Sequence, residues 1–119
     1  MARTTLTKTT ALGQFGTYSA NAADLTMTAG DASNLNQFVA SGNDLVIVRN
    51  SGAGARTLTI TSVADAQGRT GDITTYSIGA GEYAIFGPFN TTQGFRQSNG
   101  YIYLTPEHAE LLIGIVALG

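Results

Sequence analysis

Short apolar runs recur along the chain from about residue 24, and small or polar residues separate one run from the next. Runs of this length, punctuated by Gly, Asn, Asp and Ser, are typical of strands in an all-β sandwich or barrel. The texture changes at DLTMTAGD, and the strand candidates that follow are NQFVAS, NDLVIVRNS, RTLTITSV, ITTYSIG, EYAIFGPF, GFRQS, GYIYLTP and ELLIGIVAL. The pattern predicts a single all-β domain over residues 24–119.

Alternation within a run indicates which face of a strand is buried. In RTLTITSV, Leu58 and Ile60 share one face, and the opposite face carries Thr57, Thr59 and Thr61. This strand is therefore expected to have one buried and one mostly polar face. DLVIVRN and the run 111–118 do not alternate, and strands without a polar face are expected at the centre of packed sheets or against another subunit.

Turn-forming residues support the strand boundaries. Gly79 and Gly81 lie where a tight hairpin needs residues that tolerate positive φ, and residues 50–54 separate two strands. Asn99 and Gly100 form the favoured pair for a two-residue type I′ turn that joins 95–98 to 101–104. TPEHAELL is the one stretch with the capping pattern of a helical turn, and a single turn is expected there.

Residues 1–23 lack the periodic apolar face of a helix. They are rich in Thr, Ala, Gly, Ser and Asn, and their isolated apolar residues are Leu6, Leu12, Phe15 and Tyr18. This stretch is predicted to be an extended arm that precedes the β domain.

Composition excludes several classes of protein. Charged residues make up 12% of the chain, against about 25% in typical globular domains, and the six basic residues are scattered, which argues against nucleic-acid binding. The chain has no Cys for a disulfide or a thiolate metal site. The start of the chain has no continuous apolar core of a secretory signal, so synthesis in the cytoplasm is expected. The apolar C-terminal run is too short for a membrane-spanning helix.

Candidate chemistry is sparse. His108 lies beside Glu107 and near Glu110, but a lone His without a second nitrogen ligand is a poor zinc site, and a surface His on a short turn is favoured over a catalytic one. The loop DAQGRTGD has two carboxylates but lacks the dense spacing of ligands in a calcium loop, so a plain connecting loop is favoured. We therefore expect neither enzymatic activity nor a cofactor.

The aromatic residues leave two alternatives open. Tyr83, Tyr101 and Tyr103 are candidates for a platform that stacks against carbohydrate. The favoured interpretation is that such aromatic residues stabilise the sheet across neighbouring strands.

The stretches NQFVASGNDLVIVRNSG, TLTITSVADAQGRTGDITTYSIGAGEYAIFGPF and GFRQSNGYIYL resemble a group of small tailed-bacteriophage virion proteins, the head decoration or cement proteins. The resemblance spans roughly residues 36–104. It implies a β-sandwich or jelly-roll-like module on the outside of the capsid, bound to the major capsid protein and often trimeric. A tail or head-to-tail joining component and a carbohydrate-binding virion module are the alternatives.

A capsid-binding role suggests two groups of candidate residues. The arm would lie extended across a capsid subunit and pair with an exposed strand edge, with contacts from Thr4, Leu6, Lys8, Leu12, Phe15 and Tyr18. A homo-oligomer is expected, with a trimer favoured, and its expected subunit contacts are Tyr83, Tyr101, Tyr103 and Ile115. Virion surface localisation follows from the same hypothesis.

Overall fold

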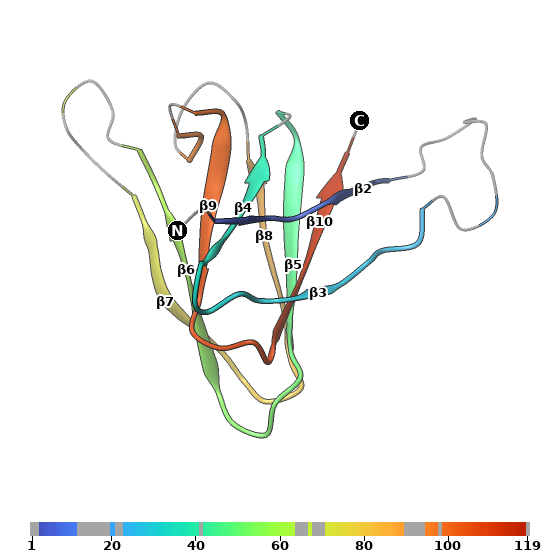
Figure 1. The fold of residues 1–119 in the computed structure, drawn as a ribbon, viewed down its shortest axis with the longest axis vertical. Helices are drawn as coiled ribbons and strands as arrows, with labels where there is room; N and C mark the ends of the chain where they lie inside the picture. Colours follow the sequence, from blue (N-terminus) through green and yellow to red (C-terminus); the bar gives the residue numbers. More distant parts are fainter. Residues whose placement is uncertain are drawn as a thin grey trace.

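The computed structural model describes residues 3–11, 20, 23–40, 42–63, 67, 71–89, 95–97 and 99–118. Within these residues the chain is all-β, with ten strands in two sheets that face each other, as the sequence predicted. Figure 1 shows the two sheets and the connections between them. The described part of the chain has no helix long and apolar enough to cross a membrane.

Sheet A has five strands in the order β1-β4-β9-β6-β7. Their bounds are β1 (Thr4–Thr5), β4 (Asn36–Val39), β9 (Tyr101–Pro106), β6 (Arg56–Thr61) and β7 (Ile73–Ile78). Strand β1 runs parallel to β4, and the other neighbours are antiparallel.

Sheet B has the order β2-β10-β5-β8. Strand β3 also pairs with β10, along the same edge as β2. The bounds are β2 (Lys8–Thr10), β10 (Leu111–Ala117), β5 (Asp44–Asn50), β8 (Tyr83–Phe89) and β3 (Thr28–Ala29). The two apolar runs that do not alternate, in β5 and β10, pair with each other over seven residues and occupy the interior of the sheet.

The core lies between the two sheets because each contributes its buried alternate positions. Sheet A contributes Phe38, Leu58, Ile60, Ile102 and Leu104, and sheet B contributes Val46, Val48, Phe86, Leu111, Ile113 and Ile115. The predicted buried face of β6 is confirmed, since Leu58 and Ile60 are fully buried. Burial of each large aliphatic side chain contributes about 1.5–3 kcal/mol relative to exposure.

Three connections cross from one sheet to the other at the same end of the sandwich, at the bottom of Figure 1. They join β5 to β6, β7 to β8 and β9 to β10. The prediction of a hairpin at Gly79 and Gly81 is therefore wrong, because β7 and β8 belong to different sheets. Gly81 lies in the turn between these strands with φ at 73°, a backbone conformation that glycine adopts without steric cost. Its N–H donates to Asn50 O at 2.8 Å.

The segment after β9 and the Asn99–Gly100 turn also differ from expectation. Residues 107–110 form bends and a turn, and only the Leu111 N–H to His108 O bond at 3.2 Å resembles a helical turn. The predicted strand over 95–98 is wrong for its described part, because residues 95–97 contain no strand. The Gln97 N–H donates to Tyr101 O at 2.8 Å, and Gly100 takes the left-handed conformation at φ 89°, which glycine adopts without steric cost.

Residues 3–11 form part of the β domain, so the expected boundary at residue 23 does not separate them from it. Strand β1 pairs with sheet A and β2 with sheet B, and Leu6 between them is 5% exposed within the core. The N-terminal segment thus lines one edge of both sheets. A burial pattern of one residue in nine has no period, which is why the sequence did not reveal these strands.

Candidate functional site

The N-terminal candidate residues make internal contacts. The Thr4 hydroxyl donates to Asp31 Oδ2 at 2.5 Å, and Leu6 is buried. The Lys8 ammonium donates to Val39 O at 2.7 Å and lies 3.7 Å from the buried carboxylate of Asp44. Leu6 therefore has little surface left for a partner. Leu12, Phe15 and Tyr18 lie outside the described residues.

Two of the expected interface residues share the outer surface of sheet A. We define the A face as the outward side chains of β4, β9 and β6, namely Gln37, Val39, Tyr101, Tyr103, Thr59 and Thr61. The register places Gln37 and Thr61 on either side of Tyr103, and Val39 opposite Tyr101. This surface is neutral and rich in hydrogen-bonding groups.

The N-terminal segment extends the A face. The Arg3 guanidinium stacks over the Tyr103 ring at 4.1 Å and donates to Asn36 O at 3.0 Å. Burial lowers the pKa of Arg3 from its ordinary value, and the nearby Tyr103 opposes that shift. The Gln37 amide donates to Thr5 Oγ1 at 3.0 Å. Arg3 and Tyr103, which are 100 positions apart in the sequence, thus meet on one surface.

Tyr83 lies on the opposite side of the molecule from this surface, on sheet B. We define the B face as the outward apolar side chains of β5, β8 and β10, namely Leu45, Ile47, Tyr83, Ile85, Leu112 and Val116. Tyr83 is 66% exposed and Ile85 is 65% exposed. The Arg49 guanidinium lies 5.7 Å from the centre of the Tyr83 ring.

Ile115, the remaining expected interface residue, points into the core and is 1% exposed. Side chains along β10 alternate between the two faces of the sheet, and Ile115 faces inward between Gly114 and Val116. A run without polar residues gives no sign of which alternate set faces inward, so the sequence could not assign it. Ile115 therefore cannot contact another subunit through its side chain in this fold.

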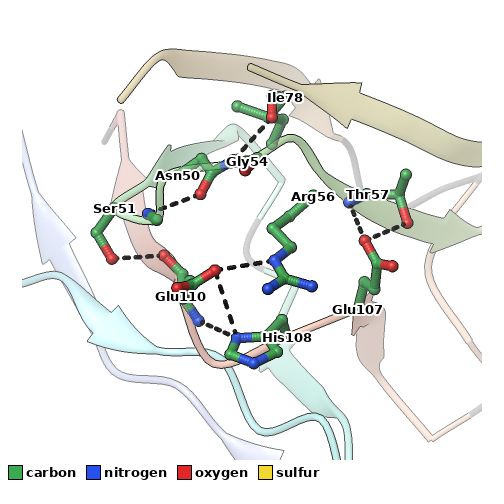
Figure 2. Close-up of polar contacts among 10 residues, drawn as sticks. Asn50, Ser51, Gly54, Arg56, Thr57, Ile78, Glu107, His108 and Glu110 are labelled. Carbon is green, nitrogen blue, oxygen red and sulfur yellow. Dashed lines mark hydrogen bonds and ion pairs between the residues drawn. The ribbon is translucent and has the colours of Figure 1, made fainter. Parts of the chain in front are cut away.

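A polar cluster closes the end of the sandwich where the connections cross, and Figure 2 shows its contacts. Arg56 Nε donates to Glu110 Oε1 at 2.9 Å, joining β6 to the turn before β10. The Glu107 carboxylate accepts the Thr57 N–H at 2.9 Å. His108 Nδ1 accepts the Glu110 N–H at 3.1 Å and lies 3.8 Å from Glu110 Oε1. These contacts hold the His108 ring within the turn before β10.

Asn50 is the buried centre of this cluster. Its amide donates to Gly54 O at 2.8 Å and to Ile78 O at 2.9 Å, and its side-chain oxygen accepts the Gly52 N–H at 2.9 Å. The sequence predicts Asn50 only as a residue of the turn after a strand. The pattern Asn-Ser-Gly after a strand signals a turn, but it carries no information about the bond to distant Ile78.

Two aspartates are held by hydrogen bonds on the surface. Asp72 Oδ1 accepts the hydroxyl of Ser62 at 2.5 Å and its N–H at 2.7 Å, and these bonds, the hydroxyl first, lower the pKa of Asp72. The pKa of Asp31 is lowered by the Asn34 N–H and then by the Thr4 hydroxyl. Asp65, from the loop weighed as a calcium site, lies outside the described residues. In the described part, no three His, Cys, Asp or Glu residues gather as a metal site.

No protein family, curated protein or solved structure matches the chain.

Proposed function

We propose that this chain is a structural protein of a tailed-bacteriophage virion, made in the host cytoplasm, that binds the outside of the capsid and stabilises it. Its partner is the major capsid protein, and it acts as a non-enzymatic homo-oligomer. The resemblance of residues 36–104 to head decoration proteins supports this proposal, and the two-sheet all-β fold agrees with the module that this resemblance implies.

We base the assignment of the capsid contact on the side chains of the A face. Strands β1 and β2 already pair with the molecule's own sheets, so we assign the contact to the A face rather than to a free arm. Its threonine, glutamine and tyrosine side chains offer hydrogen bonds without carboxylates. Tyrosine supplies a large contact area at low entropic cost, and it is frequent among the residues that dominate binding.

Capsid stabilisation would follow from mass action. A protein that bridges neighbouring capsid subunits binds the assembled shell and not the separated subunits, so it shifts the equilibrium toward the shell. An oligomer that engages several sites gains further affinity from effective concentration.

Co-sedimentation with undecorated capsids tests this assignment. Tyr103→Ala removes the ring on which Arg3 stacks and should weaken binding about ten-fold or more, as for other tyrosines at interface centres. Thr10→Ala, at an exposed position of β2 away from the A face, is the control and should change binding less than about two-fold. Equal effects of the two variants would contradict the assignment to the A face.

The same capsid experiment separates the alternatives. Rings or tubes formed by the protein, without capsid binding, would favour a tail or joining component. Binding to a glycan array that is lost with Tyr101→Ala would favour a carbohydrate-binding virion module, because sugars stack on exposed aromatic rings.

A further inference from the structure

The Arg3 guanidinium is held in place on the A face through one of its nitrogens. Nη1 donates to Asn36 O at 3.0 Å and to Leu104 O at 3.2 Å, and the group stacks over the Tyr103 ring. Nε and Nη2 donate to none of the described residues. These two nitrogens form an edge that can bind a carboxylate through two parallel hydrogen bonds. Arg3 therefore has an unused pair of donors fixed beside Tyr103.

The Tyr103 hydroxyl adds a third donor. Asn99 Nδ2 donates to Tyr103 Oη at 2.9 Å. Asn99 Oδ1 accepts the Tyr101 N–H at 3.2 Å, and this bond fixes which end of the amide faces Tyr103. Tyr103 Oη is thus the acceptor in its bond with Asn99, and its own hydrogen donates to none of the described residues. Two neighbouring side chains therefore have donors available for an acceptor from another molecule.

Charge determines which acceptor fits. The described outward positions of β4, β9 and β6 have no carboxylate. Two carboxylates that contact sheet A bind the chain's own groups, since Asp31 accepts the Thr4 hydroxyl and Glu107 accepts the Thr57 N–H. The ion pairs among the described residues do not involve Arg3. The cation of the A face therefore has no counter-charge within the described part of the chain.

We propose that Arg3 and Tyr103 bind the carboxylate of an aspartate or glutamate side chain on the capsid subunit. This inference rests on the proposed function and specifies the chemistry that the A face recognises in its partner. One arginine stacked on a tyrosine suits a single carboxylate, whereas a polyanion needs a cluster of cations. The stack and the two carbonyl bonds already hold the guanidinium, so binding costs little side-chain entropy. The contact should therefore be specific and dependent on salt.

Co-sedimentation with undecorated capsids at low and high salt tests the proposal. Arg3→Gln removes the charge and should weaken binding about ten-fold at about 50 mM salt. Raising the salt concentration to about 500 mM should weaken wild-type binding several-fold and should change binding of the variant less than about two-fold. Arg56→Gln is the matched control because it removes a cation outside the A face, and it should bind as the wild type does.

Capsids with neutralised carboxylates provide the reciprocal test. A carbodiimide and methylamine convert surface carboxylates to amides, and sedimentation identifies the shells that stay intact. Wild-type binding to these shells should fall about ten-fold, whereas Arg3→Gln should lose little more, because both changes remove the same pair. If circular dichroism shows that Arg3→Gln does not fold, Arg3→Lys replaces it. The lysine variant should bind less tightly and keep the salt dependence, since it retains the charge without the two-bond geometry.

The outcomes separate this inference from the proposed function. Wild-type binding that is unaffected by Arg3→Gln and by neutralisation of the capsid would overturn the carboxylate contact and leave the proposed function standing. Wild-type protein that does not bind untreated capsids at either salt concentration would contradict the proposed function, and this inference with it.

Discussion

The side chain of Asn50 holds three segments together through its bonds to Gly52, Gly54 and Ile78. Asn50→Ala leaves two carbonyls and one N–H without this partner. We expect a loss of about 2 kcal/mol in the free energy of unfolding, measured by urea denaturation. The exposed Asn43, changed to Ala, should cost less than about 0.5 kcal/mol. Equal losses would show that the amide does not organise this end.

The hydrogen bonds to Asp72 and Asp31 predict how stability depends on pH. Both pKa values are lowered in the folded protein, so each group binds its proton more readily when unfolded, where its pKa is about 3.9. Their contribution is therefore present above about pH 4 and is lost as pH falls through the folded pKa values.

Asp72→Asn tests this contribution, because it keeps a hydrogen-bond acceptor and removes the titration. The stability gap between wild type and variant should be largest near pH 6 and should shrink as pH falls below about 4 in urea unfolding curves. Asp24→Asn is the control, since Asp24 makes no hydrogen bond with the described residues. A gap for Asp72→Asn that stays constant with pH would contradict the assignment.

Among the elements, the N-terminal strands make the sharpest prediction. Leu6 fills the core between the two sheet edges, so Leu6→Ala should destabilise the fold by about 2–4 kcal/mol in thermal or urea unfolding. Thr10→Ala, at an exposed position of β2, should change stability by less than about 0.5 kcal/mol. Unfolding that is unaffected by Leu6→Ala would mean that residues 3–11 are not part of the cooperative domain.

The strands could be predicted from sequence wherever alternation or a dense apolar run extends over four residues or more. This holds for β4 to β10, and it fails for β1, β2 and β3, which have two or three residues each. Strand partners were not predictable, because period-two alternation identifies a buried face and not a neighbour. Gly79 and Gly81 signalled a turn correctly, but a turn between sheets and a hairpin turn use the same residues.

At the scale of the whole molecule, the two outer surfaces differ in chemistry. The A face is polar and has the Arg3 guanidinium over Tyr103, whereas the B face is apolar and has Arg49 near Tyr83. The tyrosines that the sequence grouped together separate onto these two surfaces, Tyr101 and Tyr103 on one and Tyr83 on the other. Position along the chain could not separate them, because sheet membership is set by long-range pairing.

The copy number of protein bound to undecorated capsids at saturation tests the central claim most directly. The proposed function predicts saturable binding at a whole number of copies per capsid hexamer, because symmetric shells offer equivalent sites. Absence of binding, or binding that rises without saturation, would contradict a role as a capsid decoration protein.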